Sequence, residues 1–184
     1  LCFTIDPVDG TWNFARGLTT FGTMLAMTRF GKPVWGLLYD PVMDDAISAA
    51  IDGPALLRRP RKPSLDVRVS TGGALADING YVPLYMIPAD KRGAIAATLP
   101  RFDRTGSLRC SCHEYRTFAQ GGVDFVLSAG LTPWDHAPGA LIAERAGGHV
   151  AMLDGSEYNA GTREGFLLAA ADKDTWERVR DAFA

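Results

Sequence analysis

The chain has 184 residues, of which 47% are hydrophobic and 22% are charged, and its formal net charge at pH 7 is −2. This length can bury a sizeable core, while the near-neutral charge gives no general reason to expect nucleic acid or an acidic membrane as a partner. No apolar run reaches the roughly 20 residues of a membrane-spanning helix, so the composition favours a soluble, cytoplasmic protein that acts on small solutes.

The first residues combine an apolar run with a dense polar motif. Residues 1–5, LCFTI, predict a short β-strand. The strand is expected to end at Asp6-Pro7, because proline cannot extend the ladder of a central strand. The motif DPVDGTWNF occupies residues 6–14, where a complete domain would still be forming its framework. We therefore expect an N-terminal segment to be missing.

Two aspartates of this motif are the first candidates for chemistry. In a straight strand Asp6 and Asp9 would face opposite sides, but Pro7 fixes its own φ and Gly10 permits unusual dihedral angles. A bend would bring both carboxylates together. Adjacent carboxylates repel one another, and a divalent cation, with the carbonyl oxygen of Val8 as an additional ligand, is one natural way to relieve that repulsion.

The end of the motif predicts the first turn of a short helix that is closed by Gly17. Free N–H groups of Gly10 and Thr11 at such a terminus bind phosphate oxygens, and the Thr11 hydroxyl is placed to hydrogen-bond a phosphate or an attacking water. The alternative is structural, because aspartate and threonine also commonly cap helices and initiate turns. The motif taken alone does not separate the two interpretations.

The following segment predicts a sheet and then a loop. Apolar runs over 21–30, 34–40 and 46–51 alternate with Gly, Pro and Asp, which indicates an antiparallel meander. Residues 53–66, GPALLRRPRKPSLD, are rich in proline and basic side chains, which favours a surface loop. This loop is either simply solvated or an electropositive rim that attracts an anionic substrate.

The remaining residues predict a second αβ unit, so we divide the chain into residues 1–85 and 86–184. Helices are expected over 89–99, 111–122, 132–148 and 172–183, and strands over 123–129, 149–153 and 165–171. The pattern is clearest for the helix over 132–148. It has Thr132 as N-cap, Pro133 at the first helical position and Gly147 at its end.

A third acidic residue, Asp135, falls in the first turn of that helix, where a carboxylate favours the helix dipole. It is either a capping acid or a partner of the two earlier aspartates. Its neighbour His136 is either a core or surface histidine or a substrate contact. Cys110 and Cys112 do not resemble a structural zinc site, because no second Cys or His pair has the required spacing, and reduced thiols are expected.

Two stretches carry a family resemblance. DPVDGTWNF at 6–14 is similar to a signature Asp-Pro-(Ile/Leu/Val)-Asp-Gly-Thr-x-x-Phe. WDHAPGALIAERAGG at 134–148 is similar to Trp-Asp-x-Ala-x-Gly followed by an apolar helix and Ala-Gly-Gly. Both signatures are those of the lithium-sensitive, magnesium-dependent inositol monophosphatase family. The order of the motifs, the meander and the closing strand-helix unit also agree, so the resemblance spans essentially the whole chain.

The resemblance implies a layered αβαβα sandwich of the α/β (α+β) class, in a homodimer that hydrolyses a small phosphate monoester with Mg²⁺. It implies that the metal ligands are Asp6, Asp9, Asp135 and the carbonyl of Val8. It also implies that Gly10, Thr11 and Asp135 contact the phosphate or substrate, and that Asp6 and Thr11 are catalytic, with Thr11 orienting the nucleophilic water.

The sequence departs from the family pattern in ways that bear on activity and substrate. The family's upstream segment, which carries a metal-binding Glu, has no counterpart here. Ser128 stands near the place where inositol-specific members have an acidic residue. RCSCHEYR, residues 109–116, replaces a Gly-Ser-Ala type stretch that lines the sugar site in the family. Two interpretations follow for its charged side chains: they contact a different alcohol, or they simply lie on a helix without a role in binding. The residues concerned are Arg109, His113, Glu114 and Arg116.

Two alternatives to the leading hypothesis therefore stay open. The first is a related phosphatase for a nucleotide or sugar bisphosphate or for histidinol phosphate, because the signatures do not separate these substrates. The second is a non-catalytic phosphate-binding and metal-binding dimerisation module, which the absence of the Glu motivates.

Overall fold

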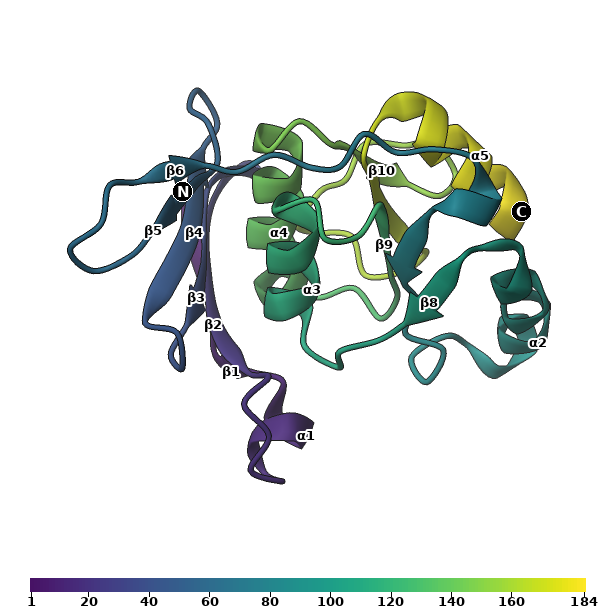
Figure 1. Cartoon of the computed structure of the whole chain (residues 1–184), viewed down its shortest axis with the longest axis horizontal. Coiled ribbons are helices and arrows are strands. Elements are labelled where there is room, and N and C mark those ends of the chain that lie inside the picture. The colour runs from purple at the N-terminus through teal and green to yellow at the C-terminus, as the bar shows by residue number, and fades with distance from the viewer.

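The computed structural model describes all residues 1–184 and arranges them in layers (Figure 1). A first sheet is followed by a pair of helices, a second sheet and a second group of helices. The first sheet holds six strands in chain order: β1 (Cys2–Asp9), β2 (Gly22–Arg29), β3 (Lys32–Asp40), β4 (Asp45–Ala50), β5 (Leu56–Arg58) and β6 (Leu65–Asp66). All neighbours in it are antiparallel, which confirms the predicted meander.

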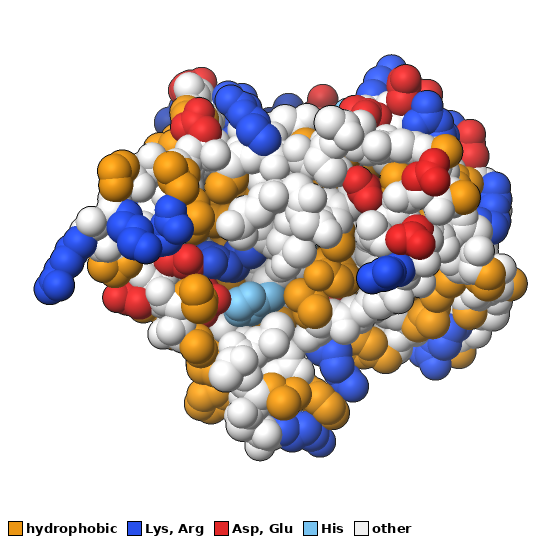
Figure 2. Space-filling view, in the orientation of Figure 1, with side chains coloured by type: hydrophobic (Ala, Val, Ile, Leu, Met, Phe, Trp, Pro, Cys, Tyr) orange, Lys and Arg blue, Asp and Glu red, His pale blue; other side chains and the backbone are white.

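The loop predicted over 53–66 is partly wrong, because β5 and β6 lie within it and extend the sheet by two short strands. Only the hairpin turn between them keeps the expected exposed basic character. Figure 2 shows Lys and Arg side chains gathered at this end of the molecule.

The predicted end of the first strand is also wrong. β1 continues through Asp6 and Pro7 as far as Asp9. The reason is its position: β1 is an edge strand, so a proline that cannot donate to a ladder is tolerated there. The sequence does not show which strand is at the edge.

The second sheet is mixed and has the order β10-β11-β9-β7-β8. Its strands are β7 (Asn79–Tyr81), β8 (Arg104–Gly106), β9 (Phe125–Ser128), β10 (His149–Met152) and β11 (Leu167–Ala170). The last three confirm predicted strands, whereas β7 and β8 were not predicted. The first sheet ends at Asp66 and the second begins at Asn79, ahead of the proposed division after residue 85.

The helices confirm the predicted ones with slightly shorter bounds. α3 (Ser111–Ala119) and α4 (Pro133–Arg145) lie between the two sheets, and α2 (Ala89–Thr98) and α5 (Lys173–Phe183) cover the far side of the second sheet (Figure 1). A short helix α1 (Thr11–Phe14) follows β1, and the 3₁₀ turns η1 (Leu75–Asp77) and η2 (Leu99–Arg101) complete the elements. None of these helices combines the length and apolar character needed to cross a bilayer.

Two apolar cores hold the layers together. The larger lies between the first sheet and the α3/α4 pair and includes Met24, Leu38, Tyr115 and Ile142. The second lies between the second sheet and the outer helices, around Phe125. Alternate residues of β9 serve the two cores, because Val126 belongs to the first and its neighbours Phe125 and Leu127 to the second.

The layers formed by residues 1–184 run sheet, helices, sheet, helices, so the outermost helical layer of the expected αβαβα sandwich is not formed by these residues. The outward face of the first sheet is accordingly open. On β1 the apolar side chains of Phe3 and Ile5 are 73% and 57% exposed.

Candidate functional site

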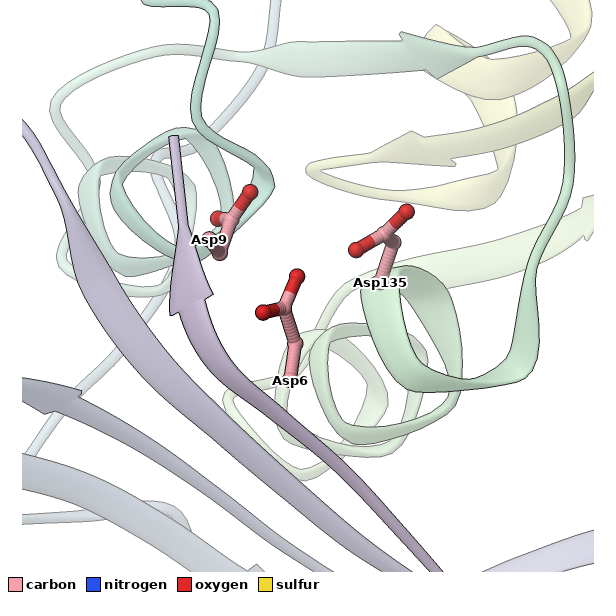
Figure 3. Close-up of side chains that lie close together, drawn as sticks. All are labelled: Asp6, Asp9 and Asp135. Carbon is pink, nitrogen blue, oxygen red and sulfur yellow. The ribbon is translucent and has the colours of Figure 1, made fainter. Parts of the chain in front are cut away.

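Three carboxylates from distant parts of the chain meet at one end of the α3/α4 layer. Asp6 and Asp9 come from the end of β1, and Asp135 comes from the first turn of α4 (Figure 3). One carboxylate oxygen from each lies within 4.8 Å of the other two. The two sequence motifs that carried the acidic candidates are therefore adjacent in space.

A β-bulge brings the two aspartates of β1 to the same side. Asp6 is opposite Met24 of β2 and Asp9 is opposite Gly22, so three steps along β1 correspond to two steps along β2. The extra residue cancels the alternation that would otherwise place the two side chains on opposite faces. Within the bulge the N–H of Val8 donates a 3.0 Å hydrogen bond to Oδ1 of Asp6, which fixes that carboxylate.

Asp9 is buried and held by the beginning of α3. The N–H of Cys112 donates to its Oδ2 at 2.5 Å, and the thiol of Cys110 lies 3.1 Å from the same oxygen. A helix N-terminus stabilises a carboxylate, yet burial is the larger effect and raises the pKa of Asp9 above its ordinary value. The α3 residues that contact Asp9 were not identified from the sequence.

Asp135 occupies the first turn of α4, and Thr132 is the N-cap residue. The Thr132 side chain does not cap the helix. Its hydroxyl instead donates a 2.6 Å hydrogen bond to Oδ2 of Asp135. Burial, followed by the nearby carboxylates of Asp6 and Asp9, raises the pKa of Asp135 to about 7. The three acids therefore form a site in which negative charge is costly unless a cation shares it.

The short helix α1 begins beside this cluster. Its N-cap is Gly10, whose φ of 79° is left-handed, and a Cβ there would lie 3.0 Å from the carbonyl oxygen of Thr20. The next residue, Thr11, is exposed, and its N–H has no intrahelical acceptor because it is the first helical residue. Gly17, with φ of 72°, follows the helix as predicted.

A residue that the sequence analysis missed anchors this helix. Asn13 is 3% exposed, and its side-chain amide donates 2.8 Å hydrogen bonds to the carbonyl oxygens of Thr20 and Leu108. It thereby ties α1 to two loops. No motif signal distinguishes it, since its partners lie 7 and 95 residues away in the sequence.

The cluster opens into a cavity of about 220 Å³. Asp9, Gly10, Thr11 and Asp135 line one part of it. The lining also includes Trp12, Tyr85, Arg109, Glu114, Ser128 and His136. The basic hairpin between β5 and β6 does not line this cavity.

The four charged or titratable candidates of the 109–116 stretch have different environments, and each of them contacts other parts of the structure or lines the cavity. They are Arg109, His113, Glu114 and Arg116. Arg116 is buried, pairs with Asp45 of β4 and donates a 2.9 Å hydrogen bond to the carbonyl of Leu38. His113 is likewise turned toward the first sheet, with Nε2 3.0 Å from the carbonyl oxygen of Phe21. Arg109 and Glu114 line the cavity.

His136 and Ser128 are buried side chains that also line the cavity. His136 is 3% exposed, neither ring nitrogen has a hydrogen-bond partner, and burial lowers its pKa to about 4. Ser128 is buried, with its Oγ 3.3 Å from the hydroxyl of Tyr115. All three cysteines are free thiols; burial raises the pKa of Cys110 and of Cys112.

The sequence is similar to those of known proteins along almost its whole length. Residues 1–182 match the model of the Inositol monophosphatase family. A relative from Thermotoga maritima named fructose-1,6-bisphosphatase/inositol-1-monophosphatase is 30% identical over 157 residues, which cover 85% of this chain and 58% of the relative. The Nus factor SuhB of Haemophilus influenzae is 31% identical over 172 residues, covering 92% of this chain and 62% of the relative.

The fold is similar to that of solved structures. An inositol monophosphatase from Zymomonas mobilis superposes with a TM-score of 0.89, at 23% identity, over 98% of this chain and 69% of that one. At this identity the likeness shows the fold alone. The chain spans somewhat more than half the length of the curated relatives it matches.

Proposed function

Because the chain belongs to the inositol monophosphatase family, we propose that it carries the metal-binding and phosphate-binding part of an enzyme that hydrolyses small phosphate monoesters with Mg²⁺. One observation carries the proposal: carboxylates of β1 and α4 converge within 4.8 Å beside the N-terminus of α1. Phosphate and cation sites are then neighbours, as phosphoryl transfer requires.

The residues present fit a hard divalent cation. Asp6, Asp9 and Asp135 offer only oxygen ligands, and burial together with the neighbouring carboxylates raises the pKa values of Asp9 and Asp135, so a cation would relieve the cost of their charge. These three side chains and the carbonyl of Val8 would hold Mg²⁺. When bound, the metal supplies charge neutralisation for the phosphoryl oxygens and activation of water.

The chain's own residues would do the rest. The N–H groups of Gly10 and Thr11 would bind the phosphate oxygens, with the phosphate also near Asp135. The Thr11 hydroxyl would accept or donate a hydrogen bond to orient the attacking water, and Asp6 would fix that water's position from the other side. The rigid attachment of α1 through Asn13 keeps these groups in one arrangement.

Two narrower questions belong to the same proposal. The substrate is either an inositol phosphate or another ester, such as a sugar or nucleotide bisphosphate or histidinol phosphate. The double name of the Thermotoga maritima relative supports a broad range. The second question is whether residues 1–184 alone catalyse or only bind, since the family's metal-binding Glu has no counterpart among them.

A panel assay tests the proposal. Residues 1–184 are incubated with inositol 1-phosphate, fructose 1,6-bisphosphate, a nucleotide 3′,5′-bisphosphate and histidinol phosphate, with Mg²⁺, with EDTA and with added Li⁺. We expect Mg²⁺-dependent phosphate release that Li⁺ inhibits. Mg²⁺-dependent phosphate binding by calorimetry without release would support the binding module instead, and the absence of both would contradict the proposal.

We infer that the family's homodimeric state and a cytoplasmic location also apply to this protein. Light scattering across a concentration series measures the oligomeric state, and a monomer at all concentrations would contradict this part.

A further inference from the structure

The wall of the cavity includes a stack of aromatic and guanidinium groups, formed by Trp12, Tyr85 and Arg109 together with Arg16. The guanidinium carbons of Arg16 and Arg109 each lie 3.9 Å from the ring centre of Trp12. Two groups this close to one ring must occupy opposite faces, because on the same face they would overlap. Arg109 also lies 4.8 Å from the ring centre of Tyr85.

The positive charges in this stack have no acidic partner. Neither Arg16 nor Arg109 has a carboxylate oxygen within 4.0 Å, although arginines elsewhere in the chain do. In addition, Nε of Arg109 is buried and makes no hydrogen bond. A buried donor without an acceptor costs free energy, so the site is set up to gain from an anion that supplies one.

The backbone of Arg109 is held in an uncommon conformation by a dedicated set of hydrogen bonds. Its φ is 56°, which only a few non-glycine residues adopt. Its N–H donates to Oγ of Ser107 at 3.1 Å, and that hydroxyl in turn donates to Oε1 of Glu114 at 2.8 Å. The N–H of Leu108 reaches the same carboxylate oxygen at 2.7 Å. Glu114 is thus a positioning residue for the loop that carries Arg109.

We propose that Arg109 binds a second anionic group of the substrate, carried by the leaving group, in the cavity that Asp9 and Asp135 also line. This inference rests on the proposed function and narrows its substrate class to small phosphate esters whose alcohol carries another phosphate or a carboxylate. The planar guanidinium is suited to either oxyanion. The phosphate and the carboxylate have in common that each presents an oxyanion to Arg109.

The same stack disfavours a nucleotide as the substrate. Both faces of Trp12 are covered by guanidinium groups, so this ring is not free to stack a base, and Arg109 also covers part of Tyr85. Ser128 and Glu114 also line the cavity, where polar side chains suit the hydroxyl groups of a substrate. These features match a hydroxylated, acidic leaving group.

Two matched substrate pairs test the inference and separate the two oxyanions. Fructose 1,6-bisphosphate is compared with fructose 1-phosphate, and 2-phosphoglycerate with glycerol 2-phosphate. The wild type should prefer the first member of at least one pair. In Arg109→Ala and in Arg109→Gln, which keeps most of the side chain's volume, the ratio of kcat/KM within the preferred pair should fall about tenfold or more.

Arg104→Ala is the control, because its side chain is 85% exposed and outside the cavity, and the ratio should not change. An unchanged ratio in both Arg109 variants would overturn the inference, and so would equal kcat/KM for both members of each pair in the wild type. Should no ester be turned over, calorimetric binding of the same four compounds with Mg²⁺ gives the ratio directly. The absence of both turnover and binding would contradict the proposed function, whereas turnover or binding with an unchanged ratio would contradict only the inference about Arg109.

Discussion

The N–H of Cys112 donates a 2.5 Å hydrogen bond to Oδ2 of Asp9, across 103 residues of sequence. This contact fixes the end of β1 against the beginning of α3, so Asp9 does not depend on the edge strand alone for its position. Asp135 is fixed independently by Thr132 at the beginning of α4. The two halves of the candidate site are therefore held by two neighbouring helices of one packed layer.

Asp135→Asn should abolish Mg²⁺ binding and turnover while raising the stability of the metal-free protein. The substitution removes one of three repelling charges and keeps an oxygen that can accept from Thr132. We expect a gain of about 1–2 kcal/mol, corresponding to a rise in Tm of several degrees. Thermal unfolding with and without Mg²⁺ measures both effects.

Asp154→Asn is the matched control, since this aspartate lies in an exposed turn and hydrogen-bonds only Ser156. It should keep the Mg²⁺-dependent rise in Tm. If Asp135→Asn also kept that rise, Asp135 would not be a metal ligand.

The stability of the metal-free protein should depend on pH through Asp135. Its pKa is raised from an ordinary 3.8 to about 7, so the folded state binds the proton more tightly than the unfolded state. Between about pH 4 and pH 7 this contribution makes stability fall as pH rises. His136, with its pKa lowered to about 4, acts in the opposite direction below pH 6.5.

The difference between Asp135→Asn and wild type isolates the effect, because His136 is present in both. The stability advantage of the variant should grow from about pH 5 to pH 7 and become constant above about pH 8. Urea unfolding at a series of pH values measures it. An advantage that shrinks over this range would show that the carboxylate is not desolvated.

Thr11→Ala should lower turnover far more than metal affinity. The hydroxyl is exposed at the start of α1 and is proposed to orient water, whereas the cation ligands are carboxylates. We expect kcat to fall about a hundredfold, as misplacement of a reacting group can cause, with little change in the Mg²⁺ dissociation constant. Thr98→Ala, at a half-buried threonine of α2 that does not line the cavity, serves as control.

Asn13→Ala should destabilise the protein and disturb the site together. The variant leaves the carbonyls of Thr20 and Leu108 without their donor and loosens α1. A loss of about 2–3 kcal/mol is expected from two buried hydrogen bonds. Denaturant unfolding measures it, and Asn159→Ala, which loses one exposed contact to Gly161, should change stability by less than about 0.5 kcal/mol.

Arg116→Ala should cost about 3–5 kcal/mol, because it leaves Asp45 as a buried charge without its partner. The exposed pair Lys32 and Glu157 gives the comparison, and Lys32→Ala should cost less than about 1 kcal/mol. Removing both buried charges, in Arg116→Met with Asp45→Leu, should cost less than Arg116→Ala alone. A more severe loss in the double variant would contradict this explanation.

Where local signals are strong, the sequence was sufficient. Thr132, Pro133 and Gly147 predicted both ends of α4, where neighbouring residues dictate the backbone. The convergence of Asp6 and Asp9 was predicted from a bend at Pro7 and Gly10, but the structure achieves it with a β-bulge against β2.

Features that depend on distant partners escaped prediction. The strands β7 and β8 have three residues each and exist only through parallel pairing with one another and, for β7, with β9. The strand β1 passes through Pro7 because it is at a sheet edge, which is a property of the whole fold. Arg109 meets Trp12 only because two loops are tied together by Asn13.

The bulge in β1 makes the site sensitive to chain length as well as to side-chain identity. Three residues of β1 span the distance of two on β2, so adding one residue to β2 between Gly22 and Met24 would restore regular pleating and turn Asp9 toward the opposite face from Asp6. Every aspartate would still be present, yet they would no longer converge. A homologue that has lost the chemistry could therefore be recognised by a one-residue gap in an alignment rather than by any substitution.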